Sequence, residues 1–248
     1  MKTKKIEIGN AILYCGDSFD ILPKLNDVCD AVISDPPFGI TSCKWDKPIP
    51  LDTLWEMLDS CTKQSANFVL FGASKFTVDL IISNRKWYRY DLIWVKSKKC
   101  GFLNANLQPM RSHESILVFN RPGFRRCATY NPQKTPGGKE RTTIRNHRST
   151  VYQNKGEFTH VSDGLQHPSS VLYFKSEFGQ HSTQKPVALM EWLVRSYTND
   201  KDIVVDPFMG SGSTAIACAI HNRQFIGIEK NIEYFDIAVE RIKKAHEG

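Results

Sequence analysis

Two short stretches of the sequence place a carboxylate directly after an apolar run. The first is DPPF at residues 35–38, which follows DAVIS at 30–34. Proline fixes φ at about −65° and has no N–H to donate, so the Pro-Pro pair ends the strand. The residue before a proline is also held extended. We therefore expect Asp35 and the Pro36 carbonyl to project rigidly past the end of a strand; the alternative is a simple turn.

The second stretch is DIVVDPFMGSGSTAIACAI at 202–220, an apolar run followed by Asp206 and a Gly-x-Gly loop that opens a helix. Gly210 and Gly212 permit positive φ and a close approach of the backbone to a ligand. A further apolar run ends at Glu229, about twenty residues on, where nucleoside-binding folds place a ribose-binding acid. The alternative is a tight strand-to-helix turn packed by glycines.

The glycine loop also indicates the kind of ligand. It has no Lys or Arg between Asp206 and Thr214, so it lacks the lysine with which phosphate-binding loops hold phosphates. A carboxylate repels pyrophosphate and suits a ligand with an ammonium or another positive centre. S-adenosylmethionine has an ammonium, a sulfonium and a ribose but no phosphate, and the loop therefore favours it as the cofactor.

Short β-branched and aromatic runs alternate with amphipathic stretches, which is typical of βα units on a largely parallel sheet. The predicted strands are 11–14, 30–34, 67–71, 90–95, 115–119, 170–174, 202–206 and 224–228, and the predicted helices are 52–63, 74–83, 186–198, 212–221 and 231–245. Strands 90–95 and 115–119 have no helix between them, so they pair as a hairpin or flank a loop. The fold class is α/β, a Rossmann-like, mostly parallel twisted sheet with helices on both faces.

From Arg121 to about Ser169 this pattern breaks down. The stretch is rich in Pro, Gly, Asn, Thr and Arg and shows no apolar period. Between Arg85 and Lys155 the chain has sixteen Lys or Arg against three acids, so the basic residues that give the chain its net charge of +7 are concentrated here. We expect a single catalytic domain over 1–248 with an irregular basic insertion at 121–169, and a polyanion as partner.

The cysteines and the amino-terminal stretch bear on the class of protein. There are seven cysteines, with no C-x-x-C pair and no clustering with histidine, so neither a disulfide framework nor a metal site is indicated. No signal peptide is recognisable, and no stretch approaches the roughly 18 apolar residues of a membrane span. We expect reduced thiols and a cytoplasmic protein with no membrane contact.

In content and order, the motifs resemble those of the amino-directed DNA methyltransferases of the permuted β group. The resemblance rests on GD at 16–17, DPPF at 35–38, HESILVF at 113–119, HSTQKP at 181–186 and DPFMGSGST at 206–214. It covers nearly the whole chain apart from 121–169, which would be the target-recognition insertion of a methyltransferase sheet. It implies transfer of a methyl group from S-adenosylmethionine to an exocyclic amine in double-stranded DNA.

The DPPF residues suit that reaction. The amine of adenine or cytosine is a poor nucleophile because its lone pair is delocalised into the ring. Asp35 and the Pro36 carbonyl could accept both amine hydrogens and free the lone pair for the methyl group, without a covalent intermediate or a metal. Pro37 adds rigidity, and the Phe38 ring could stack on a base flipped out of the duplex. Phe38 departs from the commoner tyrosine of the motif, which puts only a hydroxyl contact in doubt.

The resemblance also implies the cofactor contacts. Asp206 and its loop would approach the methionine part, Glu229 the ribose hydroxyls and Asp17 the adenine amino group, while backbone N–H groups before helix 186–198 would meet the methionine carboxylate. The predicted cofactor residues are Asp17, Asp35, His181, Ser182, Thr183, Lys185, Asp206, Pro207, Phe208, Gly210, Ser211, Gly212, Ser213, Thr214 and Glu229. Asp17 could instead be a helix cap, and Lys185 a solvated surface charge.

DNA contacts are expected in the basic insertion and in the loop 41–50. Arg and Lys bind phosphates, and Arg can also read base edges. The candidate DNA-binding residues are Trp45, Arg125, Arg126, Arg141, Arg145 and Arg148. The loop that contains Trp45 would close over the target base; the alternative is that Trp45 packs against the sheet.

Several alternatives stay open. The resemblance favours adenine N6 as the target, because the cytosine-N4 enzymes of the family more often have Ser where this chain has Asp35. Cytosine N4 remains an alternative, since the chemistry is shared, and RNA is an alternative substrate. A non-catalytic DNA-binding module and a nicotinamide-dependent oxidoreductase are the other classes. Relatives often dimerise, so a homodimer is an open alternative, as is a cognate restriction endonuclease as partner.

Overall fold

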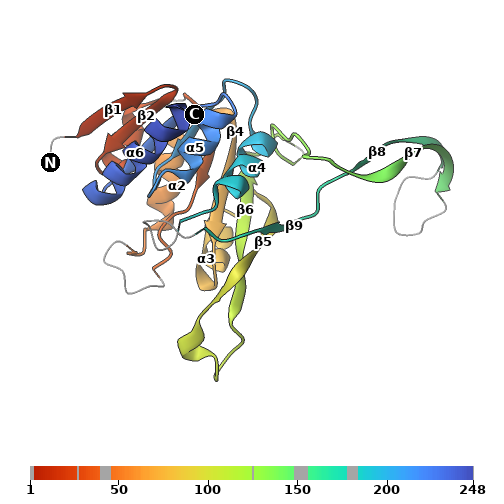
Figure 1. Cartoon of the computed structure of the whole chain (residues 1–248), viewed down its shortest axis with the longest axis horizontal. Helices are drawn as coiled ribbons and strands as arrows, with labels where there is room; N and C mark the ends of the chain where they lie inside the picture. The colour runs from red at the N-terminus through yellow and green to blue at the C-terminus, as the bar shows by residue number, and fades with distance from the viewer. Residues whose placement is uncertain are drawn as a thin grey trace. The chain divides into compact units, whose positions relative to one another are not determined.

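The computed structural model describes residues 3–26, 28–39, 46–124, 126–147, 156–177 and 184–247, with the backbone alone for 143–147, 156–158 and 160. The chain divides into two compact units. One consists of Met1–Asn131 and Ser170–Gly248, and the other of Pro132–Ser169. In the described part of the first unit the strands form one nine-stranded sheet (Figure 1), and those of the second form a two-stranded sheet.

The large sheet has the order β1-β2-β11-β10-β3-β4-β6-β5-β9. Its strands are β1 (Lys4–Ile8), β2 (Ala11–Cys15), β3 (Cys29–Ser34), β4 (Thr62–Gly72), β5 (Tyr88–Cys100), β6 (Arg111–Asn120), β9 (Val171–Phe174), β10 (Ile203–Asp206) and β11 (Gln224–Glu229). Only β1 and β6 run antiparallel to their neighbours. The eight predicted strands and the predicted hairpin, β5 with β6, are confirmed. The edge strand β1 was missed because its charged residues interrupt the apolar pattern.

The strands β10 and β3 are neighbours in the middle of the sheet, with Val204 opposite Ala31. After β3 the chain passes through α2 to β4 on one side, and after β10 it passes through α5 to β11 on the other side. Because the two connections leave in opposite directions, a crevice opens at the carboxyl ends of these strands, where open α/β sheets bind ligands. Asp35 directly follows β3 and Asp206 ends β10, so both acids lie at this edge.

Helices cover both faces of the sheet (Figure 1), as the α/β class predicts. They are α1 (Ser18–Ile21), α2 (Leu51–Ser60), α3 (Lys75–Ser83), α4 (Val187–Tyr197), α5 (Ser213–Ile220) and α6 (Ile232–Glu247), with short 3₁₀ helices η1 (Leu22–Lys24) and η2 (Phe102–Asn104). On one face α4, α5 and α6 pack with side chains such as Val69 and Val204. On the other, α2 and α3 pack with Phe68 and Leu117. The five predicted helices are confirmed, and the four residues of α1 are too few to show a helical period.

No helix in the described part of the chain is long and apolar enough to cross a membrane. The strands β5 and β6 continue as a long hairpin beyond the edge at which Asp35 lies (Figure 1). The turn of this hairpin exposes the large apolar side chains of Phe102, Leu103 and Leu107. The base of the hairpin therefore belongs to the carboxyl edge of the sheet, and its tip to the surface.

The second unit corrects the expectation of an irregular insertion. It contains β7 (Thr135–His147) and β8 (Gly156–Gln166), which pair antiparallel, with Arg141 opposite Ser162. A strand shows an apolar alternation only where one of its faces is buried. Here Val161 and Leu165 are exposed. Because this ladder buries no described apolar face, its sequence has no period from which the strands could be predicted.

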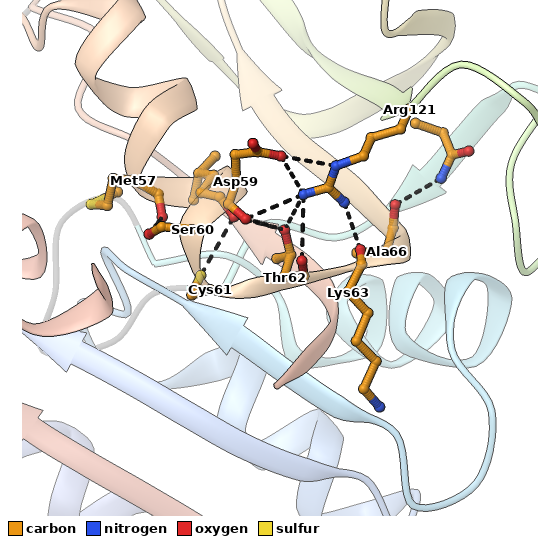
Figure 2. Close-up of polar contacts among 10 residues, drawn as sticks. Met57, Asp59, Ser60, Cys61, Thr62, Lys63, Ala66 and Arg121 are labelled. Atoms are coloured by element: carbon orange, nitrogen blue, oxygen red, sulfur yellow. Dashed lines mark hydrogen bonds and ion pairs between the residues drawn. The ribbon is translucent and has the colours of Figure 1, made fainter. Parts of the chain in front are cut away.

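Arg121, at the start of the predicted basic insertion, is a buried structural residue. Its guanidinium donates to the Asp59 carboxylate at 2.8 Å, to Thr62 Oγ1 at 2.8 Å and to the Lys63 carbonyl (Figure 2). It also lies 5.0 Å from the centre of the Trp87 ring. Asp59 lies near the end of α2 and Thr62 begins β4, so Arg121 ties the end of this helix to the sheet.

We expect Arg121→Ala to lower the free energy of unfolding by about 2–4 kcal/mol, because buried carbonyl and hydroxyl acceptors would lose their donor. Thermal melting followed by circular dichroism measures the change. Arg126→Ala, which alters an exposed side chain, is the matched control and should leave the melting temperature unchanged. An Arg121→Ala protein with wild-type stability but weakened DNA binding would contradict the structural role.

Candidate active site

A pocket of about 490 Å³ opens at the carboxyl edge of the sheet. Its wall includes the acids Asp17, Asp35, Asp206 and Glu229, which lie at or just after the ends of β2, β3, β10 and β11 respectively. These four strands are parallel neighbours. Acids that are far apart in the sequence therefore meet at one edge, and the structure brings the two predicted motifs together in one pocket.

Asp206 is bound by three neutral donors. Its Oδ1 accepts from Ser34 Oγ at 2.6 Å and from the Phe208 N–H at 3.1 Å, and its Oδ2 accepts from Thr214 Oγ1 at 2.7 Å. No ion pair with a Lys or Arg compensates this carboxylate among the described residues, and burial raises its pKa from 3.8 to about 6. A buried carboxylate without a cation favours a positively charged ligand in the pocket.

The two glycines of the loop are needed for different structural reasons. Gly210 and Gly212 have φ values of +51° and +79°. A Cβ on Gly210 would have nothing within 4 Å, and the residue lines the pocket, so its missing side chain leaves that space to a ligand. A Cβ on Gly212 would lie 3.2 Å from the Ala238 Cβ of α6. Gly212 is therefore needed where α5 begins, close against α6.

Glu229 and Asp17 both bind the chain's own backbone. Glu229 accepts from the N–H groups of Gly210 at 3.0 Å and Asn231 at 2.7 Å, and burial raises its pKa. Asp17 accepts from the Phe19 N–H at 3.1 Å and pairs with Lys230 at 2.7 Å. The interpretation of Asp17 as a helix cap is therefore confirmed, and the same side chain also lines the pocket.

Asp35 presents one free acceptor. Its side chain keeps 27% of its surface exposed, but Oδ1 itself is buried and has no hydrogen-bond partner among the described residues. Its Oδ2 accepts from the Lys185 ammonium. Pro36 is buried, Pro37 lines the pocket, and the centre of the Phe38 ring lies 5.0 Å from that of Phe76. The segment 35–38 is thus fixed by the contact of Asp35 with Lys185 and by the packing of Phe38 against Phe76.

The side chain of Lys185 is only 10% exposed, which excludes a solvated surface charge. Its ammonium pairs with Asp35 and lies 3.5 Å from Glu114 Oε2. The helix that follows differs from expectation, because α4 begins at Val187 and the Val187 N–H donates to Glu177 Oε1 at 2.9 Å. An acid of the chain therefore caps the helix at Val187. The N–H groups before Pro186 stay a prediction for the cofactor carboxylate.

The other predicted residues fall into three groups. Pro207, Phe208, Ser211, Ser213 and Thr214 line the pocket. Arg126 is exposed in the first unit, and Arg141 and Arg145 belong to β7 in the second. His181, Ser182, Thr183, Trp45, Arg125 and Arg148 lie outside the described residues.

Comparison with known proteins identifies the family. A model of N6 and N4 methyltransferases, described as DNA methylase, matches residues 29–240. The chain belongs to the N6/N4 DNA methyltransferase family. This methyltransferase is 26% identical to the type II methyltransferase M.HpaI of Haemophilus parainfluenzae, over 95% of the chain and 75% of the relative. It is 27% identical to the DNA adenine methyltransferase YhdJ of Escherichia coli (strain K12), over 93% and 82% respectively.

Solved structures agree with this assignment. The methyltransferase is similar to M1.HpyAVI, solved as a complex with SAM, with a TM-score of 0.65 and 27% identity over 92% of this chain and 98% of the other. It also shares the fold of the cytosine-N4-specific PvuII DNA methyltransferase, with a TM-score of 0.69 and 17% identity over 96% and 92%. The predicted family and the predicted fold class are confirmed.

Two residues of the methyltransferase site were missed in the sequence. Ser34 ends β3 and donates to Asp206. Glu114 lies within β6 between the ammonium groups of Lys96 and Lys185. An acid directly before the predicted strand 115–119 was a usable signal for Glu114, because a buried carboxylate requires a partner.

Proposed function

We propose that this methyltransferase transfers the methyl group of S-adenosylmethionine to the N6 amino group of an adenine flipped out of duplex DNA. The observation that carries the proposal is Asp35 in the wall of the pocket, whose carboxylate has one oxygen, Oδ1, without a hydrogen-bond partner among the described residues. This acceptor suits an N–H donor. Asp206, in the same wall and without a cationic partner in the described part of the chain, suits the positive charge of the methyl donor.

S-adenosylmethionine is the cofactor, and it supplies an electrophilic methyl group on a sulfonium centre. The residues of the pocket fit it. A volume of about 490 Å³ is ordinary for a cofactor site, and Gly210 leaves space at its wall. We propose that Asp206 and the loop 207–214 hold the methionine part, Glu229 the ribose and Asp17 the adenine; His181, Ser182 and Thr183 stay predictions.

In the proposed mechanism, Asp35 Oδ1 and the Pro36 carbonyl accept the two hydrogens of the target amine. Their pull would localise the nitrogen lone pair and so prepare the amine for the electrophilic methyl group that the cofactor would supply. The two prolines hold both acceptors in place before the base arrives, which is the condition for electrostatic stabilisation of the transition state. Phe38 offers its ring to the extruded base.

Adenine is favoured because Asp stands at the first position of the DPPF motif and because the similar protein YhdJ is named as an adenine methyltransferase. The test is a methylation assay on duplex DNA of mixed sequence, followed by nucleoside mass spectrometry of the digest. N6-methyladenine is the expected product. N4-methylcytosine would reassign the base within the same family, and cofactor binding with no methylated nucleoside would contradict the catalytic function.

We propose duplex DNA as the substrate and the cytoplasm as the location. Similar proteins are named type II methyltransferases, which supports a role in restriction and modification. A homodimer and a cognate endonuclease remain proposals. Arg126 of the first unit and the basic residues of the second unit are proposed to contact the DNA.

Replacing Arg126 and Arg141 with alanine should weaken DNA binding and flatten its salt dependence. Each arginine that neutralises a phosphate adds about 0.9 to the slope of log K against log salt. Fluorescence anisotropy over a series of salt concentrations measures this slope. Arg195→Ala, in the last turn of α4, is the control. A slope that changes in the control but not in the double variant would place the DNA surface elsewhere.

A further inference from the structure

Four charged side chains of alternating sign form a row beside the pocket, here called the charge row. Asp35 pairs with Lys185, whose ammonium lies 3.5 Å from Glu114 Oε2, and Glu114 Oε1 accepts from Lys96 Nζ at 2.6 Å. The side chains of Lys185, Glu114 and Lys96 are 10%, 8% and 13% exposed. The row thus joins the segment after β3, the segment before α4, and the two strands β6 and β5.

Stability does not explain the charge row. Taking charges out of water costs several kcal/mol per ion, and buried ion pairs are often replaced by apolar residues without loss of stability. Only one end of the row meets the pocket: Asp35 and Lys185 line it, whereas Glu114 and Lys96 stand behind them. The row therefore ends at Asp35, the acceptor in the proposed reaction.

The position of Lys185 decides which oxygen of Asp35 is free. The Lys185 ammonium takes Oδ2, and Oδ1 has no partner among the described residues. The ammonium is held in turn by Glu114 and lies 4.9 Å from the centre of the Phe71 ring. A lysine ammonium is a mobile point charge without the rigid fork of arginine. Without Glu114 it could move onto both carboxylate oxygens.

We propose that Lys185 and Glu114 are positioning residues for methyl transfer: Lys185 keeps Asp35 ionised with one oxygen occupied, and Glu114, fixed by Lys96, holds Lys185 so that Oδ1 stays free for the target amine. The inference rests on the proposed function of the pocket. It gives Lys185 a role different from the predicted one as a cofactor residue. Glu114 lies behind Lys185 and acts through it.

The charged groups around Asp35 have opposite effects on its pKa. Burial raises the pKa of Asp35; Lys185 and Lys96 lower it, and Glu114 raises it. Asp206 is a further carboxylate facing Asp35, and Arg111 faces Glu114. Removing the Lys185 cation should therefore raise the pKa of Asp35, and removing the Glu114 carboxylate should lower it. A side chain that only packs would produce neither change.

The test is the pH dependence of kcat at saturating cofactor and DNA for Lys185→Met and Glu114→Gln. Asp35 must be ionised to accept the amine hydrogen, so kcat falls on the acid side as Asp35 is protonated. Lys185→Met should move this acid limb about one unit or more to higher pH, with a loss of about tenfold at neutral pH. Glu114→Gln should move it to lower pH and also reduce the plateau, because the released ammonium competes for Oδ1.

The exposed pair Lys243 and Glu240 on α6, 3.1 Å apart, provides matched controls. Lys243→Met and Glu240→Gln should leave the acid limb in place. Melting temperature and cofactor affinity by calorimetry verify that each variant is folded. Lys185→Arg, which keeps the charge, should keep the acid limb near its wild-type position while kcat falls.

Acid limbs that do not move, or that move in the same direction in both variants, would overturn the inference and leave the proposed function intact. So would a Lys185→Met protein in which only the KM for S-adenosylmethionine rises, since Lys185 would then serve the cofactor. If Lys185→Met does not fold, Glu114→Gln decides alone, because its limb must move to lower pH. A wild-type protein that methylates no DNA would overturn the proposed function, and this inference with it.

Discussion

Asp35→Ala should abolish methyl transfer while the affinity for S-adenosylmethionine stays largely intact. The change removes the free Oδ1 that is proposed to accept the amine hydrogen. Loss of one preorganised interaction of this kind costs on the order of 3–4 kcal/mol of barrier, a factor of roughly 10² to 10³ in rate. The loss should be larger here, because the Lys185 ammonium, no longer paired with Asp35, would repel the positive charge that develops on the target nitrogen. Single-turnover methylation measures the rate, and calorimetry measures the cofactor affinity.

The matched control is Asp79→Ala, which removes an exposed carboxylate from α3 and should change neither quantity. Asp35→Asn separates shape from charge, because the amide keeps an acceptor oxygen but no longer pairs with Lys185. It should retain more activity than the alanine variant. If Asp35→Ala loses cofactor affinity and rate to the same extent, Asp35 belongs to the cofactor site and the proposed mechanism is wrong.

The sequence predicts the central sheet well because burial on both faces leaves a plain signal. Ala31, Val32 and Ile33 of β3 are all buried, so the strand is a continuous apolar run closed by proline. The same physics explains the failure at β7 and β8, whose exposed residues carry no period. Cross-strand pairing between residues such as Thr142 and Val161 is a long-range property, and composition does not reveal it.

The four acids of the pocket wall could be predicted because each follows an apolar run, and parallel strands bring their ends to one edge. The charge row could not be predicted, because Asp35 and Lys185 are 150 positions apart and meet only through the packing of different elements.

The basic composition also did not show which Lys and Arg residues are structural and which could bind DNA. Arg121 counts toward the positive charge in the sequence, yet it binds Asp59 inside the protein.

Asp206→Asn should separate cofactor binding from stability. The amide can replace the carboxylate without a gap, since its oxygen can accept from Ser34 and Phe208 and the Thr214 hydroxyl can accept from its nitrogen. The counter-charge for a cationic cofactor is lost, however. We expect affinity for S-adenosylmethionine to fall about 100-fold, the equivalent of one strong charge-assisted interaction. Calorimetric titration measures it, and Asp79→Asn is the control.

The same substitution should stabilise the cofactor-free protein above about pH 6. Asp206 ionises near 3.8 in an unfolded chain and at about 6 in the folded protein. Between these values the folded state binds more protons than the unfolded state, so this group makes stability fall as pH rises through the window. A shift of roughly two units corresponds to about 3 kcal/mol at neutral pH. Asparagine does not ionise, so the Asp206→Asn variant does not lose this stability as pH rises.

The melting temperature of Asp206→Asn should therefore match the wild type at about pH 4, exceed it increasingly up to about pH 6, and keep a constant excess above that. Differential scanning fluorimetry without cofactor follows this difference. Equal melting temperatures over the whole range would mean that the chain already compensates the Asp206 charge. Retained cofactor affinity would place the positive centre of the cofactor away from Asp206. We therefore expect the Asp206→Asn variant to be more stable than the wild type but to bind S-adenosylmethionine weakly. This is the result expected if the Asp206 carboxylate lowers the stability of the protein but is needed to bind the cofactor.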